Sequence, residues 1–259
     1  MDILKPKSVL EFGCGMGRLF PTFVDGATEI VGVDISDELL LKGKQYFEKN
    51  SVDNTDIQFV NGNMCSFANN KKYDLIVFAL SVLKHLANDT ERMQALKTAK
   101  EHLSEDGLIV IDHTALLYAD GPVDWTPASQ SLVASWVAEP EILQGYQWRK
   151  TLDGATDILE WRYQDTQQKT LFEVKFTTYR YDIEALTQHL EELGLYHELM
   201  LTEWGVNGLS DKGKRFIGIA GFPGNGRSPR ERLLEKVKRR GEKLWSNHEI
   251  ATEEMLQVS

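Results

Sequence analysis

The chain alternates short apolar segments with longer segments of helical periodicity from residue 8 to residue 114. The apolar segments are hydrophobic at nearly every position rather than at every second one, which is typical of parallel strands covered on both faces. Repeated strand–helix units of this length predict a doubly wound α/β fold. We expect strands at 8–12, 29–34, 57–61, 73–80 and 107–112, and helices directly after the first strand, at 37–50 and at 89–103.

The pattern changes in the second half of the chain. Residues 115–140 combine small, aromatic and proline residues, which favours a loop or short helices lying over the sheet. Three β-rich segments with short polar connections then predict an antiparallel β-meander inserted after strand five. Asp182 is placed to cap a helix that ends at Gly194. The meander segments are 143–150, 156–164 and 170–180, and strands at 198–204 and 215–222 complete a mostly parallel seven-stranded sheet.

The sequence divides into a main domain at 1–222 and a separate extension at 223–259. The segment 115–181 of the main domain is expected to cover a substrate site. Within the extension, residues 227–245 contain eight basic and three acidic side chains, and apolar residues fall on one helical face. A basic helical tail is therefore predicted. Its apolar face favours packing against the protein, and its charge would also suit a larger acidic partner.

Composition narrows the class of protein. The 259 residues are 42% hydrophobic and 26% charged, as in ordinary globular proteins, and a net charge of −10 opposes binding to nucleic acid. Two cysteines, Cys14 and Cys65, are too few for a disulfide framework or a zinc site. The N-terminus lacks a signal-peptide pattern, and the most apolar run, 75–83, is about half as long as a membrane span. We expect a cytoplasmic protein without a metal and without nucleic-acid or membrane partners.

Three glycines at alternate positions form the most specific motif in the sequence. Gly13, Gly15 and Gly17 follow the first expected strand. Glycines there allow a tight turn and let a ligand approach the main-chain N–H groups. Asp34 ends the next strand, 21 residues after Gly13, where a carboxylate can accept hydrogen bonds from both hydroxyls of a ribose. The combination predicts a site for a cofactor that contains adenosine.

The glycines are spaced as G-x-G-x-G and preceded by Glu11, whereas dinucleotide sites usually have G-x-G-x-x-G. With these residues the sequence resembles the class I, Rossmann-like S-adenosylmethionine-dependent methyltransferases from Val9 to about Phe222. The other matching motifs are Val33-Asp34, Gly62-Asn63-Met64, Tyr73-Asp74 and the pair Leu103 and Gly107. The resemblance implies the class I strand order, S-adenosyl-L-methionine as cofactor and S-adenosyl-L-homocysteine as its product.

The resemblance also implies roles at the cofactor site. The glycine loop, with Cys14 and Arg18, would pass beneath the methionine moiety, and Glu11 would help hold the loop and the cofactor's ammonium group. Asp34 would bind the ribose. Many members have aspartate at the position of Asn63, but an amide oxygen can still bond the adenine amino group. The remaining implied contacts are Ile35 and Met64 beside the adenine, and Ala79 and Leu80 on the methyl side.

Candidate catalytic side chains lie at the carboxyl ends of strands four and five, where open α/β sheets place their ligands. His85 follows strand four, and many members of the family have a histidine there. Asp112 and His113 end strand five, and because neighbouring residues of a strand face opposite ways, one of them should point at the site. Each of the three is a candidate base or substrate contact, with a structural hydrogen-bonding role as the alternative.

Aromatic residues are dense between residues 118 and 181. They either pack the meander onto the sheet or line a substrate cavity, and the same positions serve both interpretations. The candidates for substrate binding are Tyr118, Trp125, Trp148 and Tyr179.

The layout of the inserted meander resembles small-molecule N-methyltransferases. We expect methyl transfer by in-line displacement to a nitrogen or oxygen of a small molecule, and the acidic main domain favours an amine acceptor. Phe78-Ala79-Leu80-Ser81 stands where enzymes that methylate amino groups of nucleic-acid bases have Asn/Asp-Pro-Pro-Tyr, which argues against such substrates.

Two alternatives remain open: a peptide, protein or carrier-bound substrate docked by the basic tail, and a non-catalytic subunit that binds the cofactor. Only about seven residues precede the first strand, where most relatives have helices over the cofactor. Residues 115–140, the basic tail or a second subunit in a homodimer would then have to cover the site.

Overall fold

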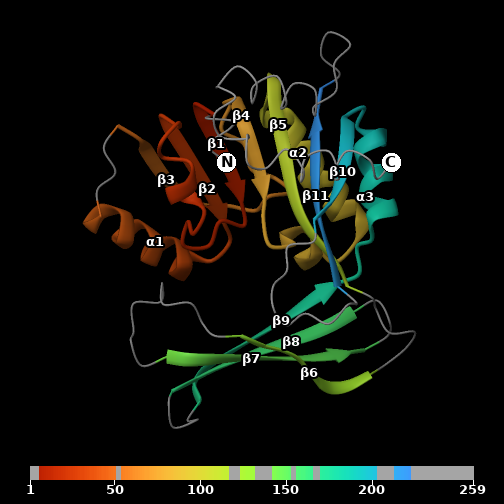
Figure 1. Cartoon of the computed structure of the whole chain (residues 1–259). Helices are drawn as coiled ribbons and strands as arrows, with labels where there is room; N and C mark the ends of the chain where they lie inside the picture. Colours follow the sequence, from red (N-terminus) through yellow and green to blue (C-terminus); the bar gives the residue numbers. More distant parts are fainter. Residues whose placement is uncertain are drawn as a thin grey trace, which may run out of the picture.

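The computed structural model describes residues 6–50, 54–116, 123–131, 142–152, 156–165, 170–202 and 213–222. The predicted basic extension at 223–259 lies outside these residues. The described elements form one sheet of seven strands and one of four (Figure 1).

The larger sheet confirms the predicted doubly wound, mostly parallel fold. Its strand order is β10-β11-β5-β4-β1-β2-β3, in which β1 to β5 run parallel to their neighbours while β11 runs antiparallel to both β5 and β10. The strands are β1 (Ser8–Phe12), β2 (Glu29–Asp34), β3 (Asp56–Asn61), β4 (Tyr73–Phe78), β5 (Leu103–Leu116), β10 (Tyr196–Thr202) and β11 (Gly213–Gly221).

Three α-helices flank this sheet, and each begins at a capping side chain. They are α1 (Asp37–Lys49), α2 (Asp89–His102) and α3 (Ile183–Glu192). Ser36, Asn88 and Asp182 each accept a hydrogen bond from a backbone N–H in the first turn, which satisfies a donor that the helix itself leaves unpaired. The predicted end of α3 is confirmed, because Gly194 adopts a φ of +65° just beyond it. None of the helices in the described ranges combines the length and apolar character needed to cross a membrane.

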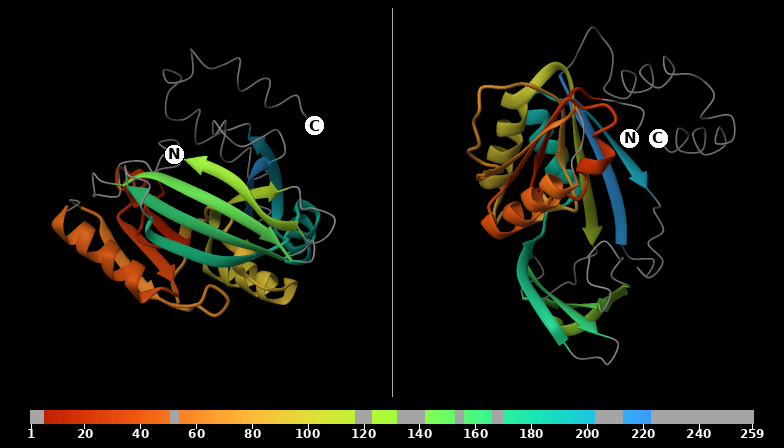
Figure 2. Two further views of the ribbon diagram at one scale, coloured as in Figure 1. Left: turned by 90° about the horizontal axis from the view of Figure 1, so that it is seen from below. Right: turned by 90° about the vertical axis from the view of Figure 1, so that its left-hand side faces the viewer.

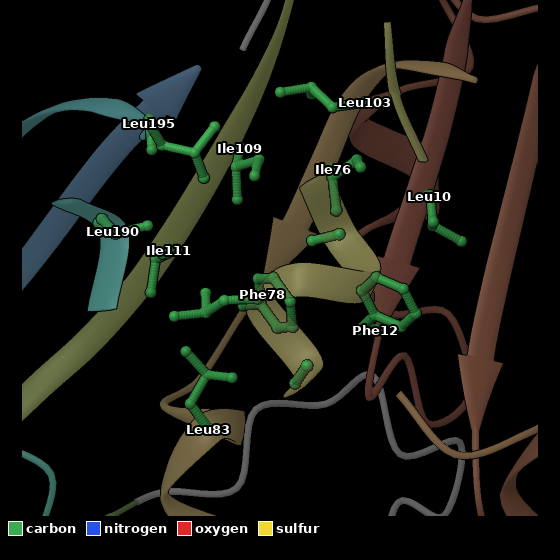
Figure 3. Packing of buried hydrophobic residues seen from close by; sticks show 14 of the residues in the cluster. Leu10, Phe12, Ile76, Phe78, Leu83, Leu103, Ile109, Ile111, Leu190 and Leu195 are labelled. Carbon is green, nitrogen blue, oxygen red and sulfur yellow. The ribbon is translucent and has the colours of Figure 1, made fainter. Parts of the chain in front are cut away.

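Buried side chains form a separate cluster on each face of the larger sheet. On one face, residues such as Phe12, Ile76 and Ile111 pack with residues of α2 and α3 (Figure 3). On the other face, Val9 and Val77 belong to the cluster that includes Leu40 of α1. Because successive strand residues point to opposite faces, strands that are apolar throughout fill both clusters.

The connection after β1 differs from the expectation of an α-helix there. The structure has only a 3-10 turn, η1 (Phe20–Thr22). Pro21 lies in this turn, and it lacks an N–H group and disfavours a continuing α-helix. The buried ring of Phe20 instead anchors the segment against Phe47 and Phe59, at centroid distances of 5.6 and 5.1 Å.

The smaller sheet contains the predicted meander and one strand that was not predicted. Its order is β6-β7-β8-β9, antiparallel throughout. The prediction of a loop or short helices is wrong for β6, where Pro127 is accommodated because the strand lies at the sheet edge, where a missing N–H can be tolerated. The strands are β6 (Val123–Ser131), β7 (Ile142–Thr151), β8 (Thr156–Asp165) and β9 (Thr170–Tyr179).

The smaller sheet lies beyond the carboxyl ends of the parallel strands, as both views from the side show (Figures 1 and 2). It leaves the larger sheet after β5 and returns to it before α3. One side of β9 contacts the 3-10 turn η2 (Val82–His85), which follows β4. This sheet is therefore called the covering sheet below.

Candidate functional site

The predicted site residues meet at one edge of the larger sheet. They follow the carboxyl ends of β3, β2, β1, β4 and β5, which are consecutive neighbours in the sheet. Parallel strands bring these ends together although they lie far apart in sequence, and this edge is where open α/β sheets place their ligands.

The glycine loop is shaped by backbone conformations that favour glycine. Gly13, Gly15 and Gly17 have φ values of +69°, +55° and +76°. The Gly13 N–H donates to the Val33 carbonyl at 2.7 Å, which bends the chain back over β2. A Cβ atom at Gly13 would stand 2.3 Å from Cγ2 of Val82. The Val82 side chain therefore packs against Gly13 of the loop. The sequence motif does not reveal this contact.

Asp34 ties the glycine loop to the start of α1. Its Oδ2 accepts a hydrogen bond from Gly15 N at 2.8 Å, and its Oδ1 accepts one from Ser36 N at 2.9 Å. Each carboxylate oxygen has a second lone pair, so a ribose hydroxyl can still donate to it. The structure thus gives Asp34 a role in shaping the loop in addition to the predicted ribose contact.

Glu11 lies buried beside the glycine loop. Only 3% of the residue is exposed, and its Oε2 has no hydrogen-bond partner. Burial raises the pKa of Glu11 to about 8; the charge of Arg18 acts against this rise and that of Asp34 adds to it. A buried acid of this kind gains stability from a nearby cation, because the cation compensates for the charge that burial disfavours.

The nearby Cys14 thiol is also buried, and burial raises its pKa, so it is not a thiolate at neutral pH.

Two large apolar side chains are exposed at this edge. Ile35 is 74% exposed and Leu80 is 59% exposed, whereas most apolar residues of the neighbouring strands are buried. Met64 is partly buried against the core, and Asn63 is exposed with its Oδ1 accepting from Cys65 N at 2.8 Å. These four side chains fit the predicted adenine and methyl sides. Ala79 is placed differently, since it is buried in the core cluster beneath the edge.

His85 lies at the end of η2 and contacts the covering sheet. The ring centroids of His85 and Phe176 are 5.3 Å apart. The pKa of His85 lies below its ordinary value, chiefly because neighbouring protein atoms desolvate the ring, while a hydrogen bond to the Thr177 backbone acts the other way. Phe176 was not among the predicted site residues, and only its place in the alternation of β9 could have suggested it.

Asp112 and His113 face different surroundings, as expected for neighbours on a strand. Oδ2 of Asp112 accepts a hydrogen bond from Leu80 N at 2.9 Å, so this carboxylate lies at the site edge. His113 is 1% exposed, and its Nε2 donates to the Tyr181 carbonyl at 2.6 Å. Burial lowers the pKa of His113 to about 4, so the ring is neutral. The structure therefore brings Asp112, and not the His113 ring, to the backbone that follows β4.

The structure describes the four predicted substrate residues to different extents. Tyr179 is partly buried at the end of β9, opposite Thr156 in the register. Trp125 and Trp148 occupy positions on β6 and β7. Tyr118 lies outside the described residues. Within the described part of the chain, no group of three or more potential metal ligands comes together.

Comparison with known proteins identifies the first part of the chain. Residues 9–107 match the family model described as a methyltransferase domain. This segment is similar to methyltransferase domains. It contains the glycine loop, Asp34, Asn63 and His85, so every cofactor-side residue discussed above lies within the matched stretch.

Curated methyltransferases are similar to part of the chain. A ribosomal protein L11 methyltransferase of Lactobacillus johnsonii (strain CNCM I-12250 / La1 / NCC 533) is 33% identical over 111 residues, which cover 42% of this chain and 31% of that protein. The chain spans 31% to 42% of the length of the curated relatives it matches.

Solved structures match over most of the chain. The CcbJ methyltransferase of Streptomyces caelestis superposes with a TM-score of 0.65 at 18% identity, covering 83% of both chains. CalS10, described as an amino pentose methyltransferase of Micromonospora echinaspora and solved with S-adenosylmethionine bound, gives 0.59 at 16% identity, also over 83% of both chains. The likeness shows that the chain has the class I methyltransferase fold over most of its length.

Proposed function

We propose that the protein binds S-adenosyl-L-methionine and transfers its methyl group to a nitrogen, or to an oxygen, of a small-molecule acceptor. The observation that carries this proposal is the glycine loop, which has three glycines in the left-handed region, is tied to Asp34 through Gly15, and follows the buried Glu11. The match of residues 9–107 to the methyltransferase domain supports it.

The residues present fit this cofactor. S-adenosyl-L-methionine carries an ammonium group and a sulfonium, and the unpartnered Oε2 of Glu11 beside the loop favours a cation nearby. Asp34 would accept the ribose hydroxyls, and Ile35 and Met64 would flank the adenine. When bound, the cofactor supplies an activated methyl group, so the protein's main task is to orient the acceptor and exclude water.

The position of the covering sheet favours a small acceptor. The covering sheet lies over the edge that holds the loop, and η2 contacts β9 (Figures 1 and 2). A structural neighbour that matches 83% of the chain is described as an amino pentose methyltransferase, and the net charge of −10 favours a cationic or neutral amine over an anion.

We expect His85 to act as the base. An amine acceptor must lose a proton before or during transfer, and a neutral imidazole near pH 7 can take it. The lowered pKa keeps the His85 ring neutral at that pH, and the ring contacts Phe176 of the covering sheet. We therefore expect turnover to fall only below about pH 6.5, the ordinary pKa of histidine, where the ring gains its proton.

The test uses S-adenosyl-L-methionine with a radiolabelled methyl group and a cell extract of the source organism, separated by size. We expect label in the small-molecule fraction, and we expect Asp34→Ala to abolish it together with cofactor binding measured by calorimetry. Label confined to the large fraction would reject a small acceptor in favour of a protein or carrier-bound one. Cofactor binding without transfer to either fraction would reject the enzymatic proposal in favour of a binding subunit.

A further inference from the structure

The two residues that follow Ala79 have an unusual backbone. Leu80 and Ser81 have φ values of +51° and +59°, so two consecutive residues other than glycine occupy the left-handed region. Each such residue costs about 1 kcal/mol or more, and the leucine has no side-chain oxygen to offset this cost. Such a conformation persists only where surrounding contacts impose it.

Asp112 imposes this conformation through two hydrogen bonds. Its Oδ2 accepts from Leu80 N at 2.9 Å, and its backbone carbonyl accepts from Ser81 N at 2.9 Å. The carboxylate is a charged acceptor, which makes its hydrogen bond to an amide stronger than a neutral one. Asp112 and Leu80 are 32 residues apart in sequence, so this arrangement depends on the pairing of β4 with β5.

The segment that Asp112 holds reaches three parts of the site. Leu80 projects an exposed side chain at the edge, Val82 lies against Gly13 of the glycine loop, and His85 contacts Phe176 of the covering sheet. A shift at Leu80 and Ser81 would therefore move the base candidate relative to the loop. Displacements of about 1 Å in such an arrangement can lower a rate by about 100-fold.

We propose that Asp112 is a positioning residue for methyl transfer, which holds the left-handed backbone of residues 80–81 and thereby sets His85 and Leu80 relative to the glycine loop. The inference rests on the proposed function. Asp112 touches neither reactant in this role; it acts through the segment that follows β4.

Three variants separate this role from a general structural one. Asp112→Ala removes the side-chain acceptor, Asp112→Asn keeps an oxygen that can accept from Leu80 N, and Asp106→Ala removes an exposed acid near the other end of the same strand. The first readout is amide hydrogen exchange of the peptide that covers residues 79–86. We expect faster exchange there in Asp112→Ala, by about tenfold or more, and wild-type exchange in Asp106→Ala.

The second readout is transfer of radiolabelled methyl from S-adenosyl-L-methionine to the small-molecule fraction, with calorimetric cofactor affinity as its reference. We expect Asp112→Ala to lower the maximal rate by about 10- to 100-fold with cofactor affinity within about twofold, and Asp112→Asn to recover most of the rate. Unchanged exchange or an unchanged rate in Asp112→Ala would overturn the proposal, and so would equal losses in both Asp112 variants. Cofactor binding without any transfer by the wild type would instead overturn the proposed function, and the role of Asp112 in transfer with it.

Discussion

The two halves of the candidate site are built in different ways. On the cofactor side, the glycine loop and Asp34 hold each other through hydrogen bonds between residues at most about 20 positions apart. On the acceptor side, His85 meets Phe176 across 91 positions of sequence, and the contact joins two separate sheets. The first half is thus specified by a short local motif, whereas the second depends on how two distant elements pack.

This difference has a consequence for mutations. A change in the loop should damage cofactor binding directly, because the loop geometry has little freedom. A change in the covering sheet should leave cofactor affinity unchanged and alter only the binding of the acceptor. The variants below test this separation in order of expected effect.

Gly13→Ala should cause the largest loss. The new Cβ would lie 2.3 Å from Val82 at a φ of +69°, so both the side-chain contact and the backbone conformation are unfavourable. We expect about 3 kcal/mol of destabilisation and at least about 100-fold weaker cofactor binding, measured by thermal unfolding and calorimetry. Gly194→Ala is the matched control, since its φ is +65° but no atom lies within 4 Å of the new Cβ. It should lose about 1 kcal/mol and bind the cofactor normally; similar binding losses in both variants would contradict the steric argument.

Phe176→Ala should impair acceptor binding and leave cofactor binding intact, the reverse of the effect expected for the glycine loop. Removing the ring that contacts His85 leaves the base less well fixed and opens the acceptor side. We expect an increase of about tenfold in the KM for the acceptor, with cofactor affinity unchanged in the same preparation. Glu173→Gln, at an exposed position of the same strand, serves as the control. Weaker cofactor binding in Phe176→Ala would show that the two halves are not separable.

Cofactor binding should release protons through Glu11. The pKa of Glu11 is about 8 in the structure, so its carboxyl group is mostly protonated at pH 7. A cation bound beside the loop favours the carboxylate and expels this proton, so affinity should rise with pH up to about 8, by at most about tenfold per pH unit. Calorimetry in two buffers of different ionisation enthalpy measures the released protons directly. Glu11→Gln should abolish the difference between the buffers, and a buffer-independent heat in the wild type would refute the linkage.

The same raised pKa has a consequence for folding. The folded state binds the Glu11 proton more tightly than the unfolded state, whose pKa is near 4.5. The stability from this group is therefore complete below about pH 4.5 and is lost as the pH rises through about 8, at up to about 1.4 kcal/mol per pH unit. Denaturant unfolding of the wild type and of Glu11→Gln over this range should show that the free energy of unfolding of the wild type falls relative to that of the variant as the pH rises. Parallel curves for the two proteins would rule this out.

Asn63→Asp should have the smallest effect. An oxygen at this position still accepts from Cys65 N, so the turn that places the residue is retained. We expect cofactor affinity to change by less than about threefold in calorimetry. A larger change would mean that the amide nitrogen of Asn63, rather than its oxygen, makes the contact with the adenine.

Sequence reasoning succeeded where a local pattern determines the structure. The apolar strands, the capped helix at Asp182 and the glycine loop with Asp34 were all predictable, because strand periodicity, capping and left-handed turns act over a few residues. It failed for the turn at Pro21 and for β6, where a proline and a sheet edge decided the outcome.

The acceptor side was less predictable for a physical reason. The pattern of Asp112 and His113 showed that only one of them would face the edge, but the choice depended on which face of β5 packs against α3 and Tyr181. Phe176 gave no signal apart from its place in a strand. Val82 gave none as a partner of Gly13, because contacts between elements are fixed by the packing of the whole fold.

The route of the chain into and out of the covering sheet makes this sheet a replaceable module. The chain departs at the end of β5 and returns at Tyr181, whose carbonyl is bound by His113 of that same strand, so both junctions lie close together. The backbone N–H groups of Gly13 and Gly15, which shape the cofactor loop, donate to Val33 and Asp34 and not to the covering sheet. A different sheet could therefore be joined at the same two neighbouring points without disturbing the hydrogen bonds that shape the glycine loop.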